Sequence, residues 1–217
     1  SRVAYGLGIP HIAFSDSPHA KAVMKLSLPY VTKLLTPWII PKKDFEVFGI
    51  DYKNIIHYRA IDAGIIIKNY KQNKKKKLNS KKIILIRPEE SEAAYIIKKS
   101  KTVKIIKKIV EKFPNEQKIV LSRYKDQTNE LKRIFGTSIS LLSKPVNGKE
   151  LLSNTDCFIG SGGTMTAESG LLGIPTISFN AIPNRIEDFL VKKRIIVRSE
   201  NPDRISREIY QSLNNTK

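Results

Sequence analysis

The chain has 217 residues and a mass of 24.6 kDa, with 41% apolar and 27% charged residues. This globular composition excludes a disordered or collagen-like chain, and the single cysteine, Cys157, excludes a disulfide framework and a cysteine-based zinc site. The 39 lysine and arginine residues exceed the 20 aspartate and glutamate residues by 19, which favours anionic ligands without naming them.

The first part of the chain has an irregular apolar pattern. It predicts a strand at 9–14, a helix at 18–35 that bends at Pro29, a strand at 35–40 and a helix at 62–70. Because the chain begins in what resembles the middle of a domain, we expect it to lack that domain's first half. The sheet of this part should then expose an unpaired edge or an apolar face.

Two interpretations of Asp16 and His19 stay open. Both follow the first expected strand in the segment Phe14-Ser-Asp-Ser-Pro-His-Ala20, where either side chain could act as a general base. The same spacing fits a helix start, with Asp16 or Ser17 as the N-cap and Pro18 at the first helical position. One residue could serve both roles.

A lysine-rich segment separates the two parts of the chain. Residues 71–81 include four consecutive lysines and lack apolar periodicity, which predicts an exposed linker between a domain at 1–75 and a second at 76–217. From Lys68 to Lys112 the sequence has 16 bases and four acids. A solvated surface explains this charge most simply; binding of nucleic acid or of an anionic membrane surface are the alternatives. No apolar stretch approaches the roughly 20 residues of a membrane span, and we expect a cytoplasmic protein.

The second part alternates short β-branched runs with helical patterns. This order predicts an α/β domain with a parallel, Rossmann-like sheet, whose ligands bind beyond the carboxyl ends of the strands. Strands are expected at 82–86, 118–122, 138–142, 156–159, 175–179 and 195–197, and helices at 91–97, 102–113, 126–135, 148–153, 164–172 and 203–213.

A glycine turn follows the fourth of these strands. In Gly160-Ser161-Gly162-Gly163-Thr164-Met165 the glycines allow a sharp turn and close approach to a ligand, and the next helix directs its free N–H groups at the same place. The turn predicts a phosphate or carboxylate site. Glu168, one helical turn later, is the only charged residue between Asp156 and Arg185, and its carboxylate suits the two hydroxyls of a ribose. The alternative is a tight turn followed by a glutamate that stabilises the helix start.

Two arginines follow neighbouring expected strands. Arg87 precedes Pro88 at the end of the first strand, and Arg123 follows the second. Each guanidinium could pair with a diphosphate, or each could form an ordinary ion pair. Asn147 and Gly148 indicate a turn.

The segment Gly162-Gly-Thr-Met-Thr-Ala-Glu-Ser-Gly-Leu-Leu-Gly-Ile-Pro-Thr176 resembles the donor-binding segment of GT-B-fold enzymes that use nucleotide sugars. It is similar to that of UDP-N-acetylglucosamine 2-epimerases and of the N-acetylglucosaminyltransferase that acts on the peptidoglycan precursor. The whole chain, including Phe14 to Ala20, Arg87, Ala94-Tyr95 and Arg123, resembles the domain of unknown function 354 family. The resemblance implies two Rossmann-like domains, the first incomplete, with the diphosphate at the glycine turn and the ribose at Glu168.

Two motifs of these relatives are absent. The pair of glutamates eight residues apart that marks retaining transferases is missing around Glu168, and Ile12-Ala-Phe-Ser-Asp-Ser-Pro-His replaces the epimerase motif His-Val-Glu-Ala-Gly-Leu-Arg. The resemblance therefore implies a glycosyltransferase or related enzyme that uses a UDP-sugar; an epimerase-like activity or a basic module for nucleic acid or membrane is the alternative. We expect no metal and no cofactor besides the nucleotide sugar, and an acceptor that is lipid-linked or anionic.

Overall fold

The computed structural model describes residues 1–68, 70, 81–89, 99–143, 146–179 and 181–214. It divides into two compact units, Ser1–Ile65 with Pro183–Phe189, and Ile66–Ile182 with Leu190–Lys217. The expected linker at 71–81, with the boundary after residue 75, and the expected helix at 91–97 fall almost wholly outside the described residues.

The first unit contains a parallel sheet of three strands. The strands are β1 (Ile12–Phe14), β2 (Lys33–Pro37) and β3 (Ile55–Tyr58), in the order β1-β2-β3. Leu34 and Ile55 on one face pack into a core with Met24 and Phe45. The sequence pattern did not predict β3, whose side chains are buried only at Ile55 and do not alternate regularly.

Helices of the first unit are short. They are α1 (Arg2–Gly6), α2 (Lys21–Ser27), α3 (Lys43–Glu46) and α4 (Asp62–Ile67), the last continuing into the second unit, with 3₁₀ turns η1 (Leu28–Tyr30) and η2 (Tyr52–Asn54). The predicted helix at 18–35 is wrong at both ends. Pro29 cannot donate a backbone hydrogen bond, Val31 is extended, and the N–H of Thr32 binds the carbonyl of His11, 2.8 Å away.

The start of α2 also differs from the expectation. Ala20, not Asp16 or Ser17, is the N-cap, and Pro18 lies in the preceding turn. The Asp16 carboxylate instead accepts a hydrogen bond of 2.6 Å from the Ser17 hydroxyl. The helix-start interpretation of Asp16 is therefore wrong, because the turn at 17–20 delays the helix.

Strand β1 forms an apolar edge of the first sheet. Among the described strands it pairs only with β2, and Ile12 and Phe14 are 57% and 68% exposed. Val3, Tyr5, Leu7 and Ile9 just before it are also exposed. The expectation that this sheet exposes an edge with apolar side chains is confirmed.

The second unit contains a parallel sheet of six strands in the order β6-β5-β4-β7-β8-β9. In chain order, β5 and β6 are added on one side of β4, and β8 and β9 are added on the opposite side, beyond β7. The direction in which strands are added therefore reverses between the two central strands, β4 and β7. The strands are β4 (Ile83–Arg87), β5 (Gln117–Leu121), β6 (Ser140–Leu142), β7 (Cys157–Gly160), β8 (Thr176–Ser178) and β9 (Val197–Arg198). Every one lies within two residues of its predicted range.

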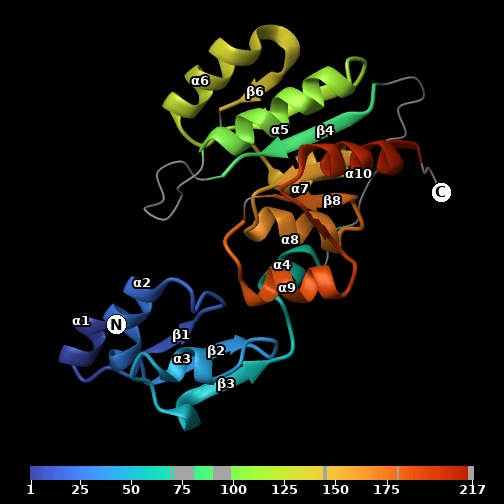
Figure 1. Ribbon diagram of the computed structural model, residues 1–217. Helices are drawn as coiled ribbons and strands as arrows, with labels where there is room; N and C mark the ends of the chain where they lie inside the picture. Colours follow the sequence, from blue (N-terminus) through green and yellow to red (C-terminus); the bar gives the residue numbers. More distant parts are fainter. Residues whose placement is uncertain (69, 71–80, 90–98, 144–145, 180, 215–217) are drawn as a thin grey trace. The chain divides into compact units, whose positions relative to one another are not determined.

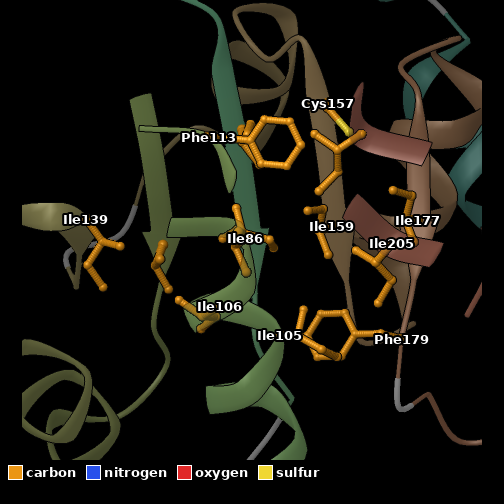
Figure 2. Packing of buried hydrophobic residues seen from close by; sticks show 14 of the residues in the cluster. Ile86, Ile105, Ile106, Phe113, Ile139, Cys157, Ile159, Ile177, Phe179 and Ile205 are labelled. Atoms are coloured by element: carbon orange, nitrogen blue, oxygen red, sulfur yellow. The ribbon is translucent and has the colours of Figure 1, made fainter. Parts of the chain in front are cut away.

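Both faces of this sheet are buried, as the β-branched runs predict. Ile84, Ile86 and Ile159 pack on one face against Ile106 of α5 and Ile205 of α10 (Figure 2), and these two helices lie side by side (Figure 1). On the other face, Leu151 and Leu152 of α7 and Met165 of α8 join a second cluster. Its other members include the strand residues Leu85, Leu121 and Phe158, and Leu172, which follows α8. Cys157 lies in the first cluster, and burial raises the pKa of its thiol to about 12, so it packs as a small apolar residue.

Five of the helices of this unit match the predicted ranges to within about three residues. They are α5 (Lys99–Lys112), α6 (Lys125–Phe135), which is followed by the 3₁₀ turn η3 (Gly136–Ser138), α7 (Gly148–Ser153), α8 (Thr164–Leu171) and α10 (Pro202–Asn214). The sequence did not predict α9 (Arg185–Lys192), whose first part belongs to the first unit. In the described part of the chain, no helix has the length and apolar character to cross a membrane.

Candidate functional site

A hollow of about 600 Å³ opens at the carboxyl ends of the central strands of the second unit. It lies where the strand order reverses, which is the usual ligand position in open parallel sheets. The lining residues come from the ends of β4, β5 and β6 and the starts of α7 and α8: Arg87, Leu121, Ser122, Arg123, Tyr124, Ser143, Val146, Gly148, Gly162, Thr164 and Met165. Two positive side chains, several hydroxyls and apolar groups therefore share one cavity.

The glycine turn forms one side of this hollow. Gly162 and Gly163 have φ angles of +81° and +78°, which side chains other than glycine rarely adopt. A Cβ atom on Gly160 would lie 2.5 Å from both the Phe158 ring and the Thr166 hydroxyl. Phe179 donates a backbone hydrogen bond of 2.9 Å to the Gly160 carbonyl. The prediction that this turn joins a parallel strand to a helix start is confirmed.

The N-terminus of α8 is available to an anion. Gly163 is its N-cap and has no side chain to occupy the free N–H groups, while Thr164 and Met165 of the first turn line the hollow. The positive end of the helix dipole thus adds to the arginine charges. This arrangement suits the oxygens of a phosphate group.

Each of the two predicted arginines donates a hydrogen bond to a neighbouring strand or helix. The Arg87 guanidinium donates to the Leu121 carbonyl at 3.2 Å, across the β4–β5 pair. The backbone N–H of Arg123 donates to the Gln127 side chain at 3.0 Å, and Gln127 donates in turn to the Glu89 carbonyl at 3.0 Å. Both arginines are among the residues that line the same hollow, as expected from parallel strands that end at one edge.

Glu168 lies one turn along α8, beyond the residues that line the hollow. Its side chain is partly buried, and this burial raises the pKa of its carboxyl, an effect that the nearby Lys149 ammonium opposes. Of the other predicted residues, Ser161 and Gly163 belong to the turn without lining the cavity. Gly162, Thr164 and Met165 line it directly.

Several lining residues were missed by the sequence interpretation. Tyr124 follows β5, and Ser143 and Val146 follow β6. Their position after the ends of expected strands was the feature of the sequence that could have predicted them as lining residues. The turn expected at Asn147 and Gly148 lies at the start of α7. Asn147 caps α7 by accepting from the N–H groups of Lys149 and Glu150, and Gly148 lines the hollow.

Asp16 and His19 lie in the first unit, in the loop that follows β1. Asp16 is partly buried, and His19 is exposed. The Tyr58 hydroxyl at the end of β3 donates to Asp62, and burial, that hydrogen bond and the charges of Asp62 and Asp16 raise the Tyr58 pKa. The loop therefore brings Asp16 near Tyr58, a neighbour that the sequence did not indicate.

A family model described as "Protein of unknown function (DUF354)" matches residues 1–216. The chain belongs to this family. An uncharacterized protein of Methanocaldococcus jannaschii is 26% identical to this chain over 98% of its residues. The chain spans 64% of the length of that relative.

Solved structures share the fold of the DUF354 chain. UDP-GlcNAc 2-epimerase from M. jannaschii, in complex with UDP-GlcNAc and UDP, has a TM-score of 0.65 and 15% identity over 99% of this chain and 65% of its own. The Neisseria meningitidis UDP-GlcNAc 2-epimerase bound to UDP-GlcNAc has a TM-score of 0.72 and 12% identity over 100% of this chain and 67% of its own. The glycotransferase of kitacinnamycin has a TM-score of 0.56 and 14% identity over 99% and 64%. The chain therefore has a GT-B-like fold with a parallel sheet in each of its two units, and it spans about two thirds of the length of these structures.

Proposed function

We propose that the second unit of this protein binds a nucleoside diphosphate sugar, with UDP-sugars as the first candidates. The observation that carries the proposal is the convergence of Arg87, Arg123 and the open N-terminus of α8 on one hollow. The diphosphate would lie against these groups, and the ribose against Glu168. The UDP complexes among the solved structures of the same fold support this class of ligand.

We propose further that the enzyme transfers the sugar to an acceptor. In an inverting transfer the acceptor oxygen bonds to the anomeric carbon, the bond to the diphosphate breaks, and a base takes the acceptor proton. Asp16, or His19 in the same loop, is the candidate base. Arginine charges and the α8 dipole would stabilise the leaving diphosphate without a metal. A lipid-linked or otherwise anionic acceptor would suit the basic chain.

Epimerisation is the second candidate reaction. Several solved structures with this fold are UDP-GlcNAc 2-epimerases, which supports a reaction that converts one nucleotide sugar into another. The two candidates share the same donor site and differ in the fate of the sugar. Incubation with UDP-GlcNAc alone, followed by chromatography of the nucleotide sugars, tests for the epimerised product, because transfer requires an acceptor that this mixture lacks.

Calorimetric titration of the purified protein with UDP, ADP, GDP and dTDP tests the donor site directly. We expect one nucleotide to bind in a 1:1 ratio at both low and high salt, because a shaped site retains affinity that a diffuse lysine surface loses. The variant Arg87→Met should lose about tenfold or more in affinity, since a charge-assisted hydrogen bond is removed. Arg133→Met, an exposed change on α6, is the matched control. Binding that disappears at high salt for every nucleotide would refute the proposal.

A further inference from the structure

A single side chain joins the two segments that follow the neighbouring strands β4 and β5. Gln127, in the first turn of α6, accepts a hydrogen bond of 3.0 Å from the backbone N–H of Arg123 through its amide oxygen. Its amide nitrogen donates a hydrogen bond of 3.0 Å to the carbonyl of Glu89, 38 residues earlier in the chain. Both ends of one amide are therefore used, one on each segment, and an apolar side chain could make neither bond.

The segment after β4 is itself held in place. Glu89 is 4% exposed, and its carboxylate accepts a hydrogen bond from the hydroxyl of Thr102 in α5, which is also buried. Only Pro88 separates Glu89 from Arg87, and its ring limits the freedom of the backbone. The carbonyl that Gln127 contacts therefore lies on a restrained segment, two residues after one of the two arginines of the hollow.

The segment after β5 is held by the same turn of α6. The Thr128 hydroxyl donates to the Tyr124 carbonyl at 2.9 Å, and it lies 2.7 Å from the Ser122 hydroxyl, within hydrogen-bond distance. Residues on both sides of Arg123 are therefore bound to α6, and the N–H of Arg123 is bound by Gln127. This restrained backbone lines the hollow, since Ser122, Arg123 and Tyr124 are all lining residues.

Gln127 is not one of the described residues that line the hollow. It can therefore influence a ligand only through the two segments that it joins. These segments carry the two arginines, and the Arg87 guanidinium already contacts the carbonyl of Leu121, two residues before Arg123. The bridge thus links the backbone from which both positive side chains extend.

We propose that Gln127 is a positioning residue that holds Arg87 and Arg123 at the spacing a nucleoside diphosphate requires. This inference rests on the proposed nucleotide site. A diphosphate has two linked phosphoryl groups, and it binds both arginines fully only if the two segments keep their separation. A monophosphate can bind either arginine alone. Because segments fixed in advance need not be ordered on binding, the bridge favours UDP over UMP.

Calorimetry with UDP, and with UMP by displacement of UDP, tests this selectivity. In the 217-residue protein, Gln127→Met should weaken UDP binding about tenfold and change UMP binding by no more than about twofold. Gln127→Asn keeps the amide but is one methylene shorter, and it should behave like the methionine variant because it cannot span both segments. Gln211→Met, the same change at an exposed position of α10, is the matched control and should leave both affinities unchanged.

A double variant tests whether Gln127 acts through the arginine pair. Once Arg123→Met has removed one arginine, the spacing of the pair no longer matters, so adding Gln127→Met should weaken UDP binding by less than about twofold further. A residue that served only the stability of α6 would lower the melting temperature and leave the ratio of UDP to UMP affinity unchanged in every variant.

Each contrary result has a distinct meaning. Equal weakening of UDP and UMP in Gln127→Met would make the residue a general support of the hollow and overturn the inference, while the proposed function would stand. Unchanged affinity for both nucleotides would overturn it as well. If the melting curve shows that Gln127→Met does not fold, the same ratio measured on Gln127→Asn decides. Wild-type protein that binds neither nucleotide would remove the proposed UDP site and the inference with it.

Discussion

Gly160 ends β7 at a point where the structure has no room for a side chain. A Cβ atom there would meet the Phe158 ring and the Thr166 hydroxyl at 2.5 Å, and Phe158 is fully buried. We expect Gly160→Ala to lower the free energy of unfolding by about 1–3 kcal/mol, the typical effect of overpacking. Urea denaturation followed by circular dichroism measures this change.

Gly148→Ala is the matched control for that prediction. Nothing lies within 4 Å of the position of its added Cβ, and the residue is at the first position of α7. Alanine should leave stability unchanged or raise it slightly, because it favours the helix more than glycine does. Equal destabilisation by both variants would show that loss of glycine flexibility, and not the clash at Phe158, is responsible.

Glu168→Gln separates a binding role from a structural one. The amide keeps the size of the side chain but replaces charge-assisted hydrogen bonds to ribose by neutral ones, so nucleotide affinity should fall about ten- to a hundredfold. Glu130→Gln on the exposed face of α6 should change nothing. A lower melting temperature with unchanged affinity would instead make Glu168 a structural residue of the helix start.

The pH dependence of the same variant follows from the raised pKa of Glu168. Burial disfavours the charged form, so the stability cost of the carboxylate is absent below its ordinary pKa of about 4.3. The cost grows as the pH rises above that value and is complete once the pH exceeds the raised folded-state pKa. Unliganded Glu168→Gln should therefore melt at or slightly above the wild type at pH 7 and with it at about pH 4. Nucleotide binding by the wild type should weaken as acid protonates Glu168, starting at a higher pH than for an ordinary glutamate.

At the scale of elements, the cap of α7 links helix stability to the site. The Asn147 side chain accepts from two N–H groups of the first turn, and the same turn carries Gly148 and Lys149. Asn147→Ala should cost about 1 kcal/mol of unfolding free energy and also weaken nucleotide binding. Asn147→Asp, which keeps the acceptor, should retain stability. If Asn147→Ala loses stability without any change in affinity, α7 supports the fold but does not shape the ligand site.

The elements predicted well from sequence are those with a local cause. Strands β4 and β7 are short β-branched or apolar runs buried on both faces, and α8 starts directly after a glycine turn, so neighbouring residues are sufficient to specify them. The second-unit site was therefore largely predictable as the ends of parallel strands. Its lining by Tyr124 and Val146 was not, because it depends on which loops meet in space.

The missed elements depend on contacts between distant residues. In α9, Ile186 packs on the first-unit core and Arg185 forms an ion pair of 2.8 Å with Asp44, 141 residues earlier. Strand β3 is specified by pairing with β2 more than by its own pattern, since two of its four side chains are exposed. The expected helix at 18–35 failed for a similar reason, because pairing with the segment around His11 outweighed the local helical preference.

At the scale of the whole molecule, the single tryptophan reports on the return of the chain to the first unit. Trp38 contacts the ring of Phe189 edge-on, with 5.7 Å between the ring centres. Trp38 is 42% exposed, so we expect Phe189→Ala to increase that exposure, shift the fluorescence emission to longer wavelength and cost about 0.5–1.5 kcal/mol from the lost ring pair alone. Tyr210→Ala, an exposed aromatic change in the second unit, should leave the emission unchanged. An unshifted spectrum in Phe189→Ala would mean that this segment does not pack on Trp38 in solution.

Because Pro183–Phe189 belongs to the first unit, that unit is discontinuous in sequence. A gene truncated after residue 65 or 75 would encode Asp44 without Arg185 and Trp38 without Phe189. Conversely, the remaining C-terminal piece would carry the apolar residues of α9 with no core to receive Ile186. Subcloning either unit by a single cut therefore yields two defective products, and an intact first unit requires the 183–189 peptide to be grafted back through an engineered linker.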